Sequence, residues 1–269
     1  SVLRLAHSGA VAPGYTADLI VLSDLEQFTV EQVSKRASWW RSRAECCTRA
    51  LTVDKARFAR VFDSFNMDEI TPEQLQLKQT GTRQRVICLT PHALLTTEKI
   101  VPFCQHPGTA PGVDVAQKIV KLAVFERHHR SGHVGLGFLG NYGLQCGAVA
   151  SSIAHDSHNL IVAGTNDADM VLAGNTVRKN KGGLAFALNG QVVGELPLPV
   201  AGLMSTESAE SVEEKLQALK AALKAHGISE DIDAFMTLAF VSLPVIPKLR
   251  LNTYGIVDVD AQQIVPAVF

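Results

Sequence analysis

The chain has 269 residues, of which 46% are hydrophobic and 19% are charged, and its formal net charge is −1. This length and apolar content allow one large buried core, or one core with a smaller companion domain. A net charge so close to zero argues against bulk electrostatic capture of nucleic acid or anionic membranes, because both need a clear basic excess.

No apolar run reaches the roughly 18 residues of a membrane-spanning helix. The opening residues, SVLRLAHSGA, lack the charged-then-apolar pattern of a signal peptide. The five cysteines form no C-x-x-C pair, which is typical of reduced thiols in a cytoplasmic protein. We therefore expect a cytoplasmic protein with neither a nucleic acid nor a membrane as its partner.

The first part of the chain gives few structural signals. Pro13-Gly14 marks a turn, and Leu19–Leu22 is predicted to be a buried strand. Residues 34–80 are predicted to be irregular and polar, with one helical turn inside FNMDEITPEQLQL.

A β-rich region begins with RQRVICLTPHALLTTEKI, residues 83–100. Residues 114–129 and 133–143 are predicted to contain neighbouring strands joined by the turn HRSGH. Residues 147–154 and 159–165 are two further apolar β-type runs, and they flank the polar sequence HDSH.

Helices follow these strands. Residues 166–180 fit a helix capped by Thr165 or Asn166, with an apolar face formed by Met170, Ala173, Gly174 and Val177. A second helix is predicted from Ser208 to His226, where Gly227 ends it.

Between and after these helices the chain shows hairpin signals. GGLAFALNGQVVGELPL has the Asn189-Gly190 dipeptide that suits a type I′ turn, and LRLNTYGIVDV predicts two short strands. Strands and helices interleave without a βαβ rhythm. We therefore predict an α+β fold, with mixed or antiparallel sheet layers covered by helices.

GLGFLG, residues 135–140, matches the glycine spacing of a dinucleotide-binding loop. Such a loop needs a helix that opens within it, and no helical pattern begins here. Glycines inside a strand more often mark close packing, so we predict no nucleotide cofactor.

Histidines gather in two places, at His128 and His129 and at His155 and His158. Paired histidines beside an acid occur in zinc sites, but H-x-x-H on a turn is a weak metal signal. Histidines more often form hydrogen bonds at a strand end or line a pocket. A Ser-His-Asp relay within Ser151–His158 is disfavoured, because neighbours on a strand point to opposite faces.

Two regions of the chain resemble adenine deaminases of the amidohydrolase superfamily. GAVAPGYTADLIVLSDLEQF, residues 9–28, looks like the segment by which amidohydrolase chains leave the catalytic (β/α)8 barrel and complete a small β domain. The second region starts near Lys118 and is similar, block by block, to the C-terminal domain of adenine deaminases. Its blocks include HVGLGFLGNYGLQCGAVASSIAHDSHNLIVAGTNDADM, ELPLPVAGLMS and FMTLAFVSLPVIPKLRLNTYGIVDV.

The resemblance implies hydrolysis of adenine to hypoxanthine and ammonia. It implies a divalent metal (Mn, Fe or Zn) that activates water, and side chains that carry protons to the departing ammonia. The barrel motifs that bind the metals, including an early H-x-H strand, have no counterpart here. We therefore expect the metal to be bound by an upstream barrel segment outside this chain, and we expect a homo-oligomer.

The resemblance also implies an order of domains. Residues 1–50 would be a fragment of the small amidohydrolase β domain, residues 51–80 a linker, and residues 81–269 the C-terminal α+β domain of adenine deaminase. The upstream barrel would then precede the first of these.

We predict that Ser152, His155, Asp156 and His158 are the residues that act on adenine or contact it. A neutral base needs a mostly apolar pocket with a few well-placed donors and acceptors. We predict no metal ligands and no cofactor-binding residues in this chain. Two alternatives stay open: a non-catalytic binding or oligomerisation module derived from this domain, and a self-contained metalloprotein that uses His128, His129, His155 and His158.

The segment Lys35–Ala50 departs from the family. It is basic and contains both tryptophans, as a nucleic-acid patch would, but the rest of the chain has no matching basic stripe. Amidohydrolases usually continue here with a strand resembling Gly-Lys-Leu-Val-Ala, and codons for Gly-Lys-Leu-Val read one nucleotide out of frame give the Ala-Ser-Trp-Trp of residues 37–40. We hypothesise a shifted reading frame, with a family-specific insertion as the alternative; resequencing the gene decides between them.

Overall fold

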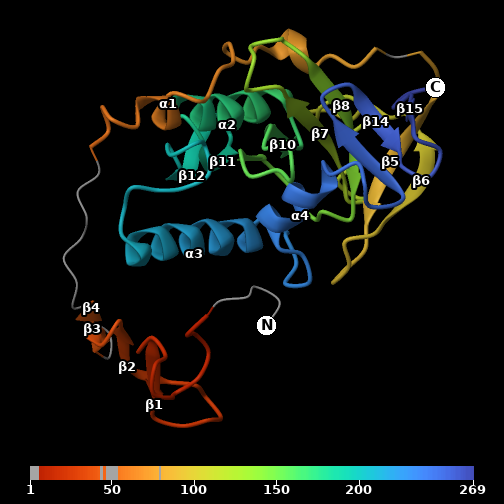
Figure 1. The fold of residues 1–269 in the computed structure, drawn as a ribbon. Helices are drawn as coiled ribbons and strands as arrows, with labels where there is room; N and C mark the ends of the chain where they lie inside the picture. Colours follow the sequence, from red (N-terminus) through yellow and green to blue (C-terminus); the bar gives the residue numbers. More distant parts are fainter. Residues whose placement is uncertain (1–5, 43–44, 47–53, 79) are drawn as a thin grey trace. The chain divides into compact units, whose positions relative to one another are not determined.

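Strands dominate the architecture and pair into three separate sheets. The computed structural model describes residues 6–42, 45–46, 54–78 and 80–269. The chain divides into two units, Ser1–Asp54 and Lys55–Phe269, whose elements are labelled in Figure 1. The domain boundaries at residues 50 and 80 stay predictions.

The first unit contains a four-stranded antiparallel sheet in the order β1-β2-β3-β4. Its strands are β1 (Leu19–Leu22), β2 (Val30–Lys35), β3 (Ser38–Ser42) and β4 (Glu45–Cys46). The predicted strand β1 is confirmed. Its predicted burial is wrong, because Ile20 is 63% and Val21 48% exposed: the sheet is a single layer, with no second layer among the described residues of this unit.

The prediction that residues 34–80 are irregular is also wrong in part. Strands β3 and β4 lie there, as does the short helix α1 (Ala59–Phe62). The single helical turn predicted in FNMDEITPEQLQL is confirmed as the 3-10 helix η1 (Pro72–Leu75). Strand β3 lies in the segment of the proposed frame shift, which stays a hypothesis; residues 43–44 and 47–53 lie outside the described residues.

The second unit is built on an eight-stranded sheet in the order β12-β11-β9-β10-β7-β8-β5-β6. The strands are β5 (Arg83–Leu89), β6 (Thr96–Pro102), β7 (Ile119–Phe125), β8 (Val134–Gly140), β9 (Ala148–Ser151), β10 (Leu160–Gly164), β11 (Gly183–Leu188) and β12 (Gln191–Pro197). The pair β5–β8 is parallel and the other neighbours are antiparallel. The predicted α+β class with a mixed sheet is confirmed, as is the pairing of β7 with β8.

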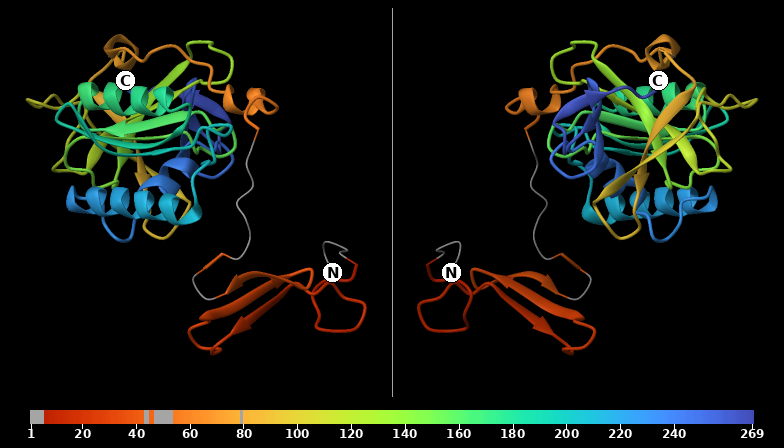
Figure 2. Two further views of the ribbon diagram at one scale, coloured as in Figure 1. Left: turned by 90° about the vertical axis from the view of Figure 1, so that its left-hand side faces the viewer. Right: turned by 90° about the vertical axis from the view of Figure 1, so that its right-hand side faces the viewer.

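Helices cover both faces of this sheet (Figure 1 and Figure 2). Helix α2 (Asp167–Lys179) covers one face together with the chain around Ile70. The other face packs against α3 (Ala209–Ala225), α4 (Ala234–Val241) and a small antiparallel sheet. That sheet consists of β13 (Leu249–Asn252), β14 (Gly255–Asp258) and β15 (Gln263–Val265). Alternate residues of each central strand therefore enter two different cores.

Local sequence signals fix the ends of α2 and the hairpin beside it. The Asn166 side chain accepts a hydrogen bond from Asp169 N, so the predicted N-cap is confirmed. Asn189 and Gly190 both have positive φ, at 52° and 77°, as a type I′ turn requires. The buried Asp169 carboxylate accepts from the backbone N–H of Asn189 and Gly190, which ties the helix to the hairpin.

The glycines of GLGFLG serve packing, as the sequence predicted. They lie in β8, on which β13 and β14 pack. A Cβ at Gly135 would lie 1.8 Å from the Asn252 carbonyl oxygen, and one at Gly137 would lie 3.2 Å from the Ile256 side chain. At position 135 only glycine allows the small sheet to approach so closely, because the contact there is with backbone.

The buried ion pair between Lys121 on β7 and Asp167 of α2 joins the sheet to the helix. The two side chains are 2.7 Å apart, and the Lys121 side chain is 1% exposed. Burial lowers the pKa of Lys121, while the hydrogen bond to Asp167 opposes that shift. The pair forms at the first turn of α2, where the negative charge of Asp167 also interacts favourably with the helix dipole.

We expect Asp167→Ala to lower the free energy of unfolding by about 2–4 kcal/mol, because it leaves a buried ammonium without its counter-charge. Urea denaturation would measure the loss. Asp63→Ala is the matched control, since Asp63 forms an exposed pair of similar length, 2.8 Å, with Lys181; the loss of stability should be much smaller there. Equal losses for the two variants would contradict the proposed cost of an unpaired Lys121.

Candidate functional site

The four residues predicted to act on adenine lie in the loop that joins β9 to β10, residues 152–159. Antiparallel pairing of β7 with β10 sets Phe125 opposite Leu160, so the loop lies beside the segment that follows β7. The loop is fixed to α4 because His155 N donates to the Ala239 carbonyl oxygen at 2.9 Å.

Ser152 points into the protein. It is fully buried, and its hydroxyl donates to the Gly202 carbonyl oxygen at 2.5 Å and accepts from Gly183 N at 2.7 Å. These bonds connect the loop, β11 and the turn at residues 200–203. Such a hydroxyl positions the backbone and has little capacity left for a ligand.

His155, Asp156 and His158 lie on the outer part of the loop. The two imidazole rings are 5.7 Å apart, and the His155 ring also packs on Phe240 of α4 at 4.7 Å. Asp156 is exposed. Burial, and then the nearby His155 and Arg127, lower the pKa of His158 against the opposite effect of Asp156. His158 is therefore favoured in its neutral form.

Arg127, which the sequence analysis did not predict, forms a hydrogen bond to the backbone of this loop. Its guanidinium donates to the carbonyl oxygens of His158 and, at 3.1 Å, of Ala201, and it stacks on the Phe65 ring at 4.8 Å. Burial lowers its pKa to about 10. The available signal was the charged pair Glu126-Arg127 directly after the apolar run of β7.

Two atoms of this group are buried without a hydrogen-bond partner in the described part of the chain: Nη1 of Arg127 and Nδ1 of His158. Buried polar atoms usually have partners. The unpaired donor follows β7 and the unpaired imidazole nitrogen lies in the loop between β9 and β10; together they could bind a polar ligand that reaches them.

The neighbouring turn uses its polar groups internally. The Glu126 carboxylate accepts from the backbone N–H of His128, His129 and Ser131, and these bonds, against the effect of burial, lower its pKa to about 2. His128 Nε2 bonds the Ser157 carbonyl oxygen at 2.6 Å. The turn thus supports the loop at residues 152–159.

The four histidines of the metalloprotein alternative do not gather around one point. Within the described residues, Cys104, His106 and Asp114 form the one group of three or more side chains placed to share a metal ion. None of His128, His129, His155 or His158 belongs to it. The geometry therefore does not favour a metal bound by these histidines.

A cavity of about 350 Å³ lies against the outer side of α4. Its lining is largely apolar, including Leu89, Leu94, Met236 and Phe240, and Arg250 also contributes. Phe240 both lines this cavity and packs on the His155 ring. The candidate loop and the cavity thus both contact the side chain of Phe240.

Comparison with known proteins gives consistent matches. Residues 93–263 match the family described as the adenine deaminase C-terminal domain. "Adenine deaminase 2" of Carboxydothermus hydrogenoformans is 42% identical over 98% of this chain and 45% of its own length. Adenine deaminases of Nitratidesulfovibrio vulgaris and Dehalococcoides mccartyi are 42% and 36% identical, over 95% and 98% of this chain. The chain spans less than half the length of these relatives. No helix among the described residues is long and apolar enough to cross a membrane.

We expect Arg127→Lys to loosen the loop, because an ammonium cannot reproduce the planar fork that serves two carbonyl oxygens. The free energy of unfolding should fall by about 2–3 kcal/mol. Hydrogen exchange at the amides of His155 and His158 should become faster. Arg130→Lys, at an exposed arginine three residues away, should leave both exchange rates unchanged. Unchanged exchange in Arg127→Lys would refute the supporting role.

His158 should titrate below the ordinary histidine pKa of about 6.5, as NMR of its imidazole protons would measure. The unfolded state then takes up the proton first, so this residue's contribution to stability is present above pH 6.5 and is lost as the pH falls towards the folded pKa. His158→Asn, which tolerates the φ of 48° there, should flatten this pH dependence. At pH 8 His158 is neutral in both the folded and the unfolded state, so the change in the free energy of unfolding in His158→Asn at that pH reports the lost packing of the ring. A folded pKa at or above 6.5 would contradict the burial argument.

Proposed function

Since the chain belongs to the adenine deaminase C-terminal domain family, we propose that it works as the C-terminal part of an adenine deaminase. The reaction is adenine plus water to hypoxanthine plus ammonia. Named adenine deaminases match nearly the whole chain, which supports this proposal. We propose it for this chain together with a barrel segment corresponding to the remaining length of those relatives. A cytoplasmic location and a homo-oligomer belong to the same proposal.

The catalytic metal is proposed to lie outside this chain. The loop at residues 152–159 presents no third ligand beside His155 and His158 among the described residues, so it does not fit a catalytic metal ion. We therefore assign no step of the reaction to a metal bound by this loop. Manganese, iron and zinc all stay open for the barrel segment.

We propose that His155 and His158 contact the purine. The observation that supports this role is the buried, unpartnered Nδ1 of His158. A neutral imidazole can accept from the exocyclic amine or donate to a ring nitrogen, depending on its tautomer. Asp156 is exposed next to them and can accept a proton or a hydrogen bond. Ser152 would act by holding the loop through Gly183 and Gly202.

Supporting this assignment, the loop is held in place from two sides. The Arg127 guanidinium fixes its His158 end, and the Ala239 carbonyl oxygen fixes its His155 end. Positioned donors and acceptors bind a ligand at lower entropic cost than mobile ones. A rigid loop of this kind suits recognition of a small planar base.

The test is a chimera in which this chain replaces the matching part of the Carboxydothermus relative. The folded chimera should form hypoxanthine and ammonia from adenine, and this chain alone should form neither. His155→Ala and His158→Ala in the chimera should each lower kcat/KM by about 10- to 100-fold. Ser157→Ala, on the same loop but with an exposed side chain, should retain the activity.

A folded chimera that forms no hypoxanthine would favour the non-catalytic module instead. Turnover by this chain alone would contradict the proposed location of the metal. Full activity in both histidine variants would contradict the proposal that this loop contacts the purine.

A further inference from the structure

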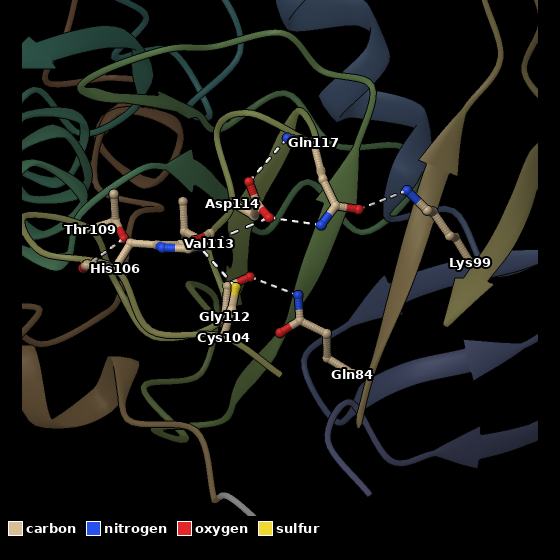
Figure 3. Close-up of polar contacts among 9 residues, drawn as sticks. All are labelled: Gln84, Lys99, Cys104, His106, Thr109, Gly112, Val113, Asp114 and Gln117. Carbon is tan, nitrogen blue, oxygen red and sulfur yellow. Dashed lines mark hydrogen bonds and ion pairs between the residues drawn. The ribbon is translucent and has the colours of Figure 1, made fainter. Parts of the chain in front are cut away.

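The connection between β6 and β7 brings a thiol, an imidazole and a carboxylate together (Figure 3). One ligand atom each from Cys104, His106 and Asp114 lies within 4.8 Å of the others. The His106 Nε2 atom is 3.9 Å from Asp114 Oδ2, and Cys104 is a free cysteine. We propose that these three side chains bind one zinc ion.

The spacing is close to that of a tetrahedral zinc site. Zinc bonds of about 2.0–2.3 Å to sulfur, nitrogen and oxygen imply ligand atoms roughly 3.3–3.8 Å apart. The ligand atoms in the structure lie within 4.8 Å of one another, which is at most about 1.5 Å beyond the spacing of a zinc site. The His106 side chain is half exposed, so its ring can make the remaining adjustment without disturbing the core.

The carboxylate is held in place by a further shell of side chains. Asp114 accepts from the backbone N–H of Gln117 at 3.0 Å and from its Nε2 at 2.8 Å. The Gln117 Oε1 atom in turn accepts from Lys99 Nζ at 3.1 Å. Figure 3 shows this chain of bonds running from β6 to the site. Outer partners of this kind orient metal ligands in known sites.

A buried amide supports the backbone next to the ligands. Gln84 is fully buried, and its Nε2 donates to the Gly112 carbonyl oxygen at 2.7 Å. Gly112 N donates in turn to the Cys104 carbonyl oxygen at 2.8 Å. The Gln84 Oε1 atom has no hydrogen-bond partner within the described residues. The Gln84 amide thus fixes the backbone at Gly112, and through it the chain that carries Cys104.

The donor set selects the metal. Magnesium and calcium prefer oxygen ligands alone, whereas a thiolate with an imidazole suits zinc. Three protein ligands leave a fourth position open for water or another ligand. The three ligands lie within eleven residues of one connection, so bound zinc would stiffen the chain between β6 and β7.

The experiment uses the whole 269-residue chain, stripped of metal and titrated with Zn²⁺ by calorimetry. We expect one ion per chain. Co²⁺, as a probe of the same site, should produce a thiolate charge-transfer band and the intense visible bands of tetrahedral geometry. Cys104→Ser, His106→Ala and Asp114→Asn should each weaken zinc binding at least about 100-fold, and Gln117→Ala about 10-fold.

Cys146→Ser and His129→Ala are the matched controls, since they remove a free thiol and an exposed imidazole elsewhere; both should keep the site. His106→Ala is the most informative variant, because loss of a half-exposed ring should weaken zinc binding and leave the fold intact. Circular dichroism would verify the fold. Absence of stoichiometric zinc, or binding that survives both Cys104→Ser and His106→Ala, would overturn the proposal. Adenine is absent from the assay, so this result is independent of the deaminase proposal.

Discussion

The buried guanidinium of Arg127 is the constraint on which the candidate site depends. A buried charge is stabilised by fixed hydrogen-bond acceptors, and Nε and Nη2 of Arg127 donate to the carbonyl oxygens of His158 and Ala201. Gly202 has no side chain, because a Cβ there would lie 2.8 Å from the guanidinium nitrogens. The hydrogen bonds of one arginine thus connect the candidate loop to the turn at residues 200–203.

The eight-stranded sheet determines which segments meet Arg127. Antiparallel pairing places the end of β7 opposite the start of β10. The residues after Phe125 and the loop before Leu160 therefore lie side by side at the same end of these two central strands. Helix α4 packs on one face of the sheet next to this end of the strands. It supplies the Ala239 carbonyl oxygen for His155 and the Phe240 ring for the imidazole. Loop, helix and cavity therefore form one continuous region.

Sequence patterns predicted most of the second unit, because its strands and helices carry strong local signals. The apolar runs of β7 to β10, the Asn166 cap and the Asn189-Gly190 turn all gave the observed elements. The first unit was harder. β2 reads VEQVSK, which lacks a clear apolar alternation, and the burial of β1 could not be judged without knowing what packs on its sheet.

The sequence by itself determined the order of strands β7 to β12 and of helices α2 and α3, the α+β class and the kinship with adenine deaminases. Periodicity, capping and turn chemistry act over a few residues and can be read along the chain. Only the tertiary structure showed that Ser152 is fully buried while His155 and His158 are partly buried, and that Arg127 binds the His158 carbonyl oxygen. It alone brought Cys104, His106, Asp114 and Gln84 to one place. Such contacts depend on strand register and loop closure, which no local pattern specifies.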